Sequence, residues 1–368
     1  MTGTGRKKKI LYLMHIDWNW IKQRPHFLAE GLSSLYDVLV LYHYSSDRSV
    51  LVDNSTTIKN YPIPRVPFGR FSPVEKTNVF FQKIFFNFLL KIYNPDIVWI
   101  TFPSLYNYVA ECDLRNRTLV YDCMDDAVEF LSDDNYRRSI HNVEQTVLER
   151  ADIVFASSQN LLSKLTERGC ISSKISLIRN AFDNKVPINF PGDVSKEEPA
   201  LESSYRLCYV GTVADYIDFE VILFCLHNLP SIEFHFIGPI VCNVPAHENM
   251  FFHGPVQHVE LSRIVSEYDG FLLPFKVNEL VLGVDPVKLY EYVNFNKNII
   301  SIYYDEIKRF KDFVNFYENK EDFVDVVRRV SKMKGAKYSL DARQDFLTQN
   351  SWAVRVSTIA KLLEIDYS

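Results

Sequence analysis

Short apolar runs and stretches of helical periodicity alternate along most of the chain. In the first half, the runs typical of buried strands are residues 10–14, 36–42, 97–101, 118–121 and 153–156. Helical spacing of apolar residues is found at 25–35 and 139–150. In the second half, strand-like runs at 206–210, 233–237, 270–274 and 298–302 alternate with helical patterns at 219–226, 260–267, 288–293 and 352–363. Such alternation predicts parallel sheets covered by helices on both faces.

The stretch between residues 183 and 204 interrupts this alternation. It contains Pro187, Pro191, Gly192 and Pro199 and has neither a strand nor a helix period, which is typical of a linker or a long surface loop. We therefore expect an α/β protein with two doubly wound, Rossmann-like domains at residues 1–184 and 185–345. Because ligands of such folds bind outside the carboxyl ends of the strands, we expect them in a cleft between the domains.

Composition and charge exclude several classes of protein. The 368 residues suffice for two domains, and a hydrophobic share of 47% is enough to build their cores. The net charge of −5 argues against a nucleic-acid-binding protein, which would carry a basic surface. The 6 cysteines are scattered without a Cys-x-x-Cys pair, so neither a metal site nor a disulfide scaffold is indicated. Reduced thiols favour a cytoplasmic protein.

The basic segment at residues 6–9 precedes the first apolar run. That run is too short for a signal peptide, because His15, Asp17 and Asn19 interrupt it. No run reaches the ~18 apolar residues that are needed to span a bilayer. The start of the chain is therefore interpreted as a first buried strand behind a basic tail.

A lysine and a glutamate lie three positions apart in the helix expected at residues 288–293. Lys288 and Glu291 share one helical face, one turn apart. Pro286 suits the first turn of that helix, and Asp285 suits its N-cap. A helix N-terminus, a cation and a carboxylate on one patch suit a phosphate and a ribose diol. The alternative is a surface ion pair of small energetic consequence.

The surroundings of this pair resemble a known family. Residues 269–275 (DGFLLPF), a short loop and residues 285–292 (DPVKLYEY) are similar to the GT-B-fold nucleotide-sugar glycosyltransferases that build bacterial surface polysaccharides. The resemblance implies a GT-B fold, with two Rossmann-like domains facing a central cleft. It also implies that Lys288 contacts the donor phosphates, Glu291 contacts the ribose, and Phe275 lies beside the sugar and diphosphate.

Further landmarks follow in the order typical of that family. They are residues 178–183 at the hinge, 209–212 (YVGT), 236–239 (FIGP), 252–256 (FHGPV) and a terminal helix after Ser351. The resemblance implies that Gly211 lets the backbone approach the phosphates, that the loop around Pro255 packs on the base, and that residues 346–368 pack back on the first domain. The expected donor site comprises Gly211, Thr212, Pro255, Val256, Phe275, Asp285, Lys288, Leu289 and Glu291.

One carboxylate typical of many retaining members is missing. Such enzymes carry two glutamates eight positions apart, and the residue eight positions before Glu291 is Gly283. Either Asp285 or Glu279 replaces it, or the sugar is held differently. The donor base (uridine or guanosine), the sugar and the stereochemistry of transfer stay open.

Polar and aromatic residues follow the first expected strand. Residues 23–26 (QRPH) resemble a signature of the family branch that includes teichuronic acid synthesis. Trp18 and Trp20 are candidates for stacking on an acceptor sugar, and Arg24 for contacting its hydroxyls or a lipid-linked phosphate. Asp17 is a candidate for contact with the acceptor and for catalysis. In the alternative interpretation, the tryptophans are packing residues and Arg24 is a cap or a surface charge.

Three aspartates, Asp122, Asp125 and Asp126, follow the strand expected at residues 118–121. Carboxylates at a strand end are costly unless they are solvated, paired or functional. We expect Asp122 and Asp126 to be catalytic, because a general base must deprotonate the acceptor hydroxyl. The alternatives are a helix N-cap and a divalent-ion site. The resemblance implies that neither a metal nor another cofactor is needed.

Residues 79–91 form a strongly apolar, aromatic helix candidate that contains Lys83 and Lys91. The segment is too short to span a bilayer but suits a membrane interface. A buried core helix is the favoured interpretation.

These observations predict a glycosyltransferase that moves a sugar from a UDP- or GDP-linked donor to a saccharide or lipid-linked saccharide. It would be cytoplasmic or peripheral at the inner face of the membrane. The alternative is a catalytically inactive binding or scaffold protein with the same fold. A nucleotide-sugar epimerase or dehydrogenase is disfavoured, because no Gly-x-Gly-x-x-Gly follows the first strand.

Overall fold

The computed structural model describes residues 6–44, 57–65, 72–129, 133–183, 204–256 and 263–364. The chain divides into two compact units, Met1–Arg179 with Trp352–Ser368, and Asn180–Ser351. The chain passes from the first unit to the second after Arg179, slightly before the domain boundary expected at residue 184. It returns to the first unit at Trp352, slightly after the boundary expected at residue 345. Nearly all of the expected linker at 183–204 falls outside the described residues.

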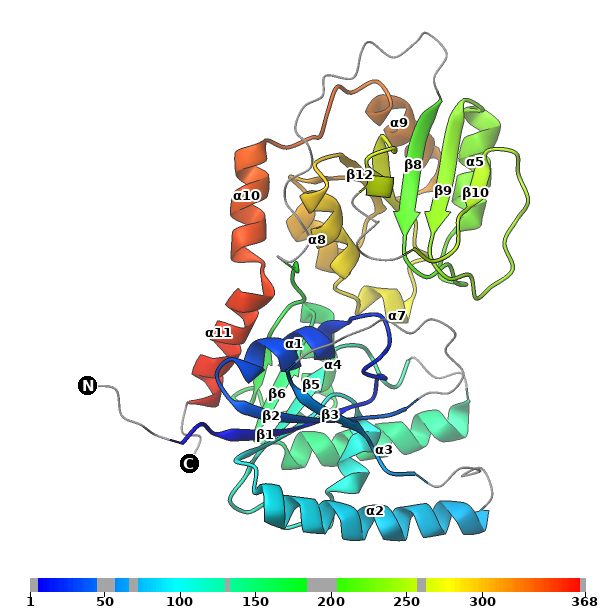
Figure 1. Cartoon of the computed structure of the whole chain (residues 1–368). Coiled ribbons are helices and arrows are strands. Elements are labelled where there is room, and N and C mark those ends of the chain that lie inside the picture. The colour runs from blue at the N-terminus through cyan, green and yellow to red at the C-terminus, as the bar shows by residue number, and fades with distance from the viewer. Residues whose placement is uncertain are drawn as a thin grey trace. The chain divides into compact units, whose positions relative to one another are not determined.

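The first unit contains a seven-stranded parallel sheet in the order β3-β2-β1-β4-β5-β6-β7. Its strands are β1 (Lys9–Met14), β2 (Asp37–Tyr42), β3 (Lys59–Pro62), β4 (Ile97–Ile100), β5 (Thr118–Cys123), β6 (Ile153–Ala156) and β7 (Ile175–Leu177). Its helices are α1 (Arg24–Ser33), α2 (Ser72–Tyr93), η1 (Pro103–Tyr108), α3 (Asp134–Arg150), α4 (Gln159–Glu167) and α11 (Trp352–Leu363). Helices lie on both faces of the sheet (Figure 1). The central strands β4 and β6 are therefore buried on both sides, which explains their continuous apolar runs.

The second unit contains a six-stranded parallel sheet in the order β10-β9-β8-β11-β12-β13. Its strands are β8 (Tyr205–Val210), β9 (Ile232–Ile237), β10 (Met250–Phe252), β11 (Gly270–Leu273), β12 (Asn298–Ile302) and β13 (Val314–Tyr317). Its helices include α5 (Phe219–Asn228), α7 (Glu279–Leu282), α8 (Val287–Asn294), η2 (Asp305–Phe310), α9 (Lys320–Val330) and α10 (Leu340–Gln349). The two sheets confirm the predicted α/β class. The first residues of the helix expected at 260–267 fall in the stretch 257–262, which lies outside the described residues.

The C-terminal helix α11 packs against α1 in the first unit. Phe27 and Trp352 stack with their ring centroids 5.1 Å apart. A Cβ atom added to Gly31 would lie 2.4 Å from Cγ2 of Val356, so only glycine permits this approach of the two helices. The contact ties the end of the chain to its beginning.

Helix α2 differs from the buried core helix that the sequence favours, because only one of its faces is buried. Asn78, Gln82, Phe86 and Leu90 are the buried row. The opposite face carries Phe80, Phe81, Ile84, Phe88 and Ile92, all of which are exposed. No helix in the described ranges is long and apolar enough to cross a membrane.

The approach of α1 to α11 can be tested with a two-residue cycle. Gly31→Ala should destabilise the first unit by about 1 kcal/mol, because the clash with Val356 outweighs the gain in helix propensity. Val356→Ala alone should also destabilise it, because it leaves a cavity. The double variant should nevertheless be more stable than Gly31→Ala. All 4 tryptophans (Trp18, Trp20, Trp99, Trp352) belong to this unit, so tryptophan fluorescence during urea unfolding measures its stability selectively. If the losses of stability caused by Gly31→Ala and Val356→Ala simply added in the double variant, the close contact between Gly31 and Val356 would be contradicted.

Candidate functional site

Arg24 and Asp122 form an ion pair in the interior of the first unit. Nε and Nη2 of Arg24 donate to Oδ1 of Asp122 at 3.0 and 2.7 Å. Nη1 of Arg24 donates to the carbonyl of Ile178 at 2.6 Å. The side chain of Asp122 is fully buried and that of Arg24 is 1% exposed. The two charges compensate each other, so the pair fixes α1 to the end of β5 and presents neither group to an acceptor. The pair as the structure shows it is structural, and the catalytic role of Asp122 and the acceptor role of Arg24 stay predictions.

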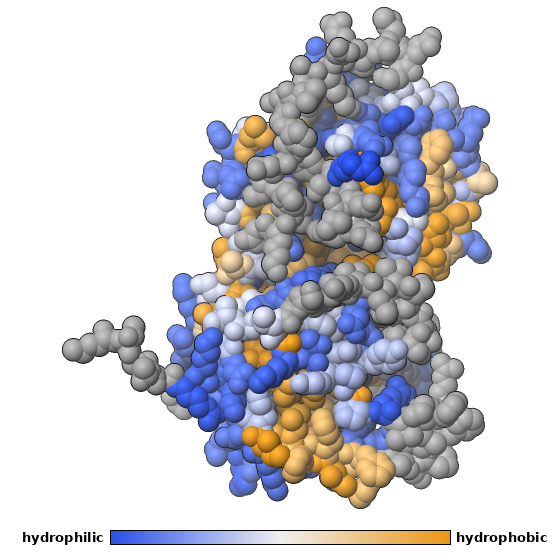
Figure 2. Space-filling view, in the orientation of Figure 1, coloured by the Kyte–Doolittle hydropathy of each residue, from blue (hydrophilic) through white to orange (hydrophobic). Residues whose placement is uncertain are grey.

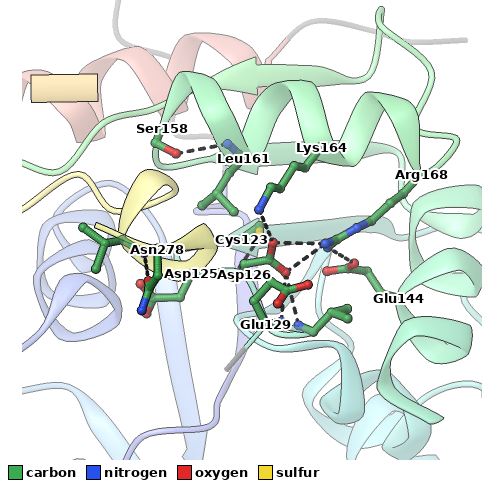
Figure 3. A network of polar contacts seen from close by, with 12 residues as sticks. Cys123, Asp125, Asp126, Glu129, Glu144, Ser158, Leu161, Lys164, Arg168 and Asn278 are labelled. Atoms are coloured by element: carbon green, nitrogen blue, oxygen red, sulfur yellow. Dashed lines mark hydrogen bonds and ion pairs between the residues drawn. The ribbon is translucent and has the colours of Figure 1, made fainter. Parts of the chain in front are cut away.

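Asp126 belongs to a second buried network (Figure 3). Arg168 donates to Asp126 at 2.9 Å and to Glu144 at 2.8 Å, so it bridges the two carboxylates. Lys164 lies 3.2 Å from Asp126 on its other side. Burial raises the pKa of Asp126, but Arg168 and Lys164 outweigh burial and lower it overall. A carboxylate held ionised by two cations is a poor proton acceptor, so these contacts favour a structural role for Asp126, and its catalytic role stays a prediction.

Asp17 and Trp18 lie in the turn after β1 and are buried. The carboxylate of Asp17 accepts the backbone N–H of Asn19 at 2.9 Å, which is a local turn contact. Trp18 is 2% exposed and packs against the ring of His26, which favours the alternative of a packing residue; its acceptor contact stays a prediction. Trp20 is half-buried, and its predicted acceptor contact stays a prediction.

Asp125 lies with Asp122 and Asp126 at the end of β5, but the sequence analysis did not select it as a catalytic residue. It is half-buried. Burial raises its pKa to about 7, against the opposing effect of Arg24, while the neighbouring charge of Asp126 adds to the rise. A carboxyl that titrates near neutral pH suits general base chemistry. The sequence alone does not show which of the three aspartates has a raised pKa. That depends on which of them form ion pairs in the folded chain, as Asp122 and Asp126 do.

In the second unit, glycines end two adjacent strands. Gly211 follows β8 with φ +144°, and Gly238 follows β9 with φ +147°. A Cβ on Gly238 would lie 2.1 Å from the carbonyl oxygen of Gly211, so the two backbones touch. The N–H of Gly211 donates to the carbonyl of Ile237 at 2.8 Å, and the hydroxyl of Tyr292 accepts the N–H of Val210 at 2.9 Å. These contacts fix the backbone at the carboxyl end of β8.

Lys288 lies directly against this backbone. A Cβ on Gly211 would lie 2.1 Å from Cε and 2.7 Å from Nζ of Lys288. The ammonium is also 5.8 Å from the ring centroid of Tyr209. Among the described residues, no carboxylate lies within ion-pair distance of it. Burial lowers the pKa of Lys288, and the charge of Glu291 partly offsets that effect. The side chain is thus a desolvated cation beside a backbone turn, an arrangement that would suit an anion.

Asp285 anchors the start of α8. Its carboxylate accepts the N–H of Asn180 at 2.7 Å and the hydroxyl of Tyr290 at 3.0 Å, and it pairs with Arg309. The predicted N-cap is wrong, because Pro286 occupies that position without a side-chain bond. Since its oxygens are engaged within the second unit, Asp285 positions α8 and is poorly placed to contact a donor.

The other residues expected at the donor site fall into two groups. Leu289 and Phe275 are buried in the core of the second unit, where Phe275 packs edge-on against Tyr209 and Tyr216. Thr212, Val256 and Glu291 are half-buried, and Pro255 is exposed. The carbonyl of Thr212 accepts hydroxyls from Tyr209 at 3.0 Å and Tyr216 at 2.6 Å. The structure brings Gly211, Thr212 and Lys288 together, and Glu291 follows one turn along α8.

Two parallel α/β units, one of which places a lysine against a glycine at a strand end, define the class: the chain has the GT-B fold. It is 21% identical over 296 residues to the teichuronic acid biosynthesis glycosyltransferase TuaH of Bacillus subtilis (strain 168), covering 73% of this chain and 72% of that protein. This similarity confirms the family resemblance drawn from the motifs. No protein-family model matches the chain.

Solved structures show the same fold at low identity. Sucrose-phosphate synthase from Thermosynechococcus elongatus superposes with a TM-score of 0.71 at 13% identity, covering 97% of this chain and 98% of that one. HepE of Anabaena in complex with UDP gives 0.69 at 13% identity, with 96% and 99% covered. The lipopolysaccharide outer core galactosyltransferase WaaB gives 0.65 at 14% identity, with 97% and 100% covered.

The structural role of Asp122 predicts a loss of stability on its removal. Asp122→Ala should destabilise the first unit by about 3–5 kcal/mol in urea unfolding followed by tryptophan fluorescence, because the charge of Arg24 is left buried and unpaired. Arg24→Met combined with Asp122→Leu should recover at least half of that loss. A stable Asp122→Ala protein that lacks only activity would instead support the catalytic role.

Proposed function

We propose that the chain is a glycosyltransferase that binds a nucleotide-sugar donor on its second unit, at the carboxyl end of β8, and transfers the sugar to a saccharide or lipid-linked saccharide. The observation that carries the proposal is the half-buried ammonium of Lys288 beside the Gly211 turn. An unpaired, desolvated cation is costly by itself, and a diphosphate would compensate it.

The diphosphate would fit there for steric and electrostatic reasons. Gly211 has no side chain, so the phosphate can approach the backbone closely. Lys288 would supply the positive charge that stabilises the leaving nucleotide, and for that reason the proposal includes no metal ion or other cofactor. Glu291 lies one helical turn beyond Lys288, where its carboxylate would accept hydrogen bonds from the ribose hydroxyls.

A uridine nucleotide is the preferred donor in this proposal. The support is that structures of the similar protein HepE contain UDP and UDP-glucose. The sugar itself would require a carboxylate that Glu291 does not supply. Asp285 is engaged with Asn180, Tyr290 and Arg309, and Gly283 ends α7. We therefore assign the sugar contact to Glu279, which is exposed at the start of α7.

The acceptor would meet the first unit at the carboxyl end of β5. We assign deprotonation of its hydroxyl to Asp125, because Asp122 and Asp126 are neutralised by cations whereas burial raises the pKa of Asp125 to about 7. A lipid-linked acceptor would place the enzyme at the cytoplasmic face of the membrane. Transfer from UDP-sugars to such acceptors would exclude the alternative of an inactive binding protein.

Lys288→Met tests the phosphate assignment. UDP should raise the melting temperature of the wild-type protein, and isothermal titration should show affinity for UDP about 10- to 100-fold lower in the variant, because one charge-assisted contact is lost. Uridine without phosphates should bind both proteins equally weakly. Lys332→Met is the matched control, because Lys332 is exposed and distant along the chain.

The same titration distinguishes the ribose contact assigned to Glu291 from the phosphate contact assigned to Lys288. Glu291→Gln should weaken UDP binding but not the binding of 2′,3′-dideoxy-UDP, which lacks the hydroxyls that Glu291 would accept. Equal UDP affinity in the wild type and in Lys288→Met would refute the assignment of the phosphate to Lys288.

A further inference from the structure

The outer face of α2 carries a row of large apolar side chains that are exposed to solvent. Phe80, Ile84, Phe88 and Ile92 recur every four residues, and Phe88 and Ile92 are 63% and 65% exposed. Figure 2 shows hydrophobic surface gathered at the position of α2 in Figure 1. Contiguous apolar patches of this kind on a soluble domain mark an interaction surface.

The buried face of α2 does not require those residues. Phe86 stacks on Tyr108 with ring centroids 5.0 Å apart, and Gln82 donates to the carbonyl of Pro64 at 3.0 Å. The inward row thus includes amide side chains, whereas the outward row is entirely apolar. A helix that only covered its own sheet would have apolar side chains on the inward face and polar side chains on the outward face.

A shallow hollow lies on the outer face. It has a volume of about 400 Å³ and is lined by Phe80, Lys83, Ile84, Asn87, Phe88 and Lys91. Lys83 pairs with Glu111, while Lys91 is exposed. From residue 78 to residue 93 the helix contains no acidic residue. This part of the helix therefore presents apolar and cationic side chains, and the carboxylate of Glu111 reaches the surface from outside the helix.

Further cations gather at the C-terminal end of α2. Lys9 donates to the carbonyl of Tyr93 at 3.0 Å, and Arg6 reaches the carbonyl of Asn94 at 3.5 Å. Arg117 donates to the carbonyl of Leu90 at 3.2 Å. These residues cap the helix dipole, and together with Lys91 they make this end positively charged despite the ion pair between Arg6 and Asp96.

We propose that α2 is a membrane-docking helix that lies in the interface of an anionic bilayer. Its phenylalanines would enter the boundary between head groups and acyl chains, and the basic cluster at its C-terminal end would contact phosphate head groups. Charge complementarity favours an anionic lipid surface over a second protein, because the cations around the apolar row, Lys83, Lys91, Arg6, Lys9 and Arg117, outnumber the carboxylates of Glu111 and Asp96 that pair with them. The inference specifies the surface for the peripheral location proposed above, and it does not require transfer activity.

Co-sedimentation with vesicles tests this surface. Wild-type protein should sediment with phosphatidylcholine vesicles that contain phosphatidylglycerol, and less with phosphatidylcholine alone. Phe80→Ser combined with Phe88→Ser should weaken binding at least about tenfold, because burial of even one phenylalanine changes an equilibrium constant by that factor. Arg6→Gln with Lys91→Gln should remove the preference for anionic vesicles. Ile171→Ser is the control, because Ile171 is equally exposed in the same unit but outside α2.

Each result has a distinct consequence. Binding by the phenylalanine variant equal to that of the wild type, or no binding by the wild type, would overturn the proposal. A wild-type dimer in light scattering that the phenylalanine variant dissociates, without vesicle binding, would assign α2 to a protein interface instead. The thermal shift with UDP should be the same in all variants, so failure of the donor site is measured separately from failure of docking.

Discussion

The proposed donor site depends on one steric constraint, the contact between the Lys288 side chain and the backbone of Gly211. Any Cβ on Gly211 would overlap the lysine, and any Cβ on Gly238 would overlap Gly211. The end of β8 is therefore fixed from one side by β9 and from the other by α8. A cation is placed where water is partly excluded, and its electrostatic effect on the diphosphate proposed to bind there would be correspondingly large.

Other contacts of the second unit support that geometry. Tyr292 on α8 accepts the N–H of Val210, so the helix that carries Lys288 also holds the strand end that the lysine touches. Asp285 attaches the start of the same helix to Asn180 and Arg309. In the proposed site, Tyr292 and Asp285 would act on the donor only through Lys288 and Glu291. Their substitution should change the position of α8 and not the chemistry of the site.

The parallel strands and the shared face of Lys288 and Glu291 were predictable from the sequence, whereas the ion pairs of the buried aspartates were not. Parallel strands were predictable because burial on both faces produces continuous apolar runs, as in β4 and β6. The Lys288–Glu291 face was predictable because helical spacing is local. The roles of Asp122 and Asp126 were not, because their partners Arg24, Lys164 and Arg168 lie far away in the sequence. The exposed face of α2 matches the alternative that the sequence analysis ranked second, because the apolar pattern does not distinguish a helix buried on both faces from one buried on a single face.

The central claim is that Lys288 and Gly211 bind the diphosphate of a nucleotide sugar. A crystal structure of the protein with UDP tests it most directly. The account predicts the β-phosphate within hydrogen-bond distance of Nζ of Lys288 and of the backbone after β8, with the ribose hydroxyls on Glu291. UDP bound elsewhere, or bound with its phosphates away from Lys288, would contradict it.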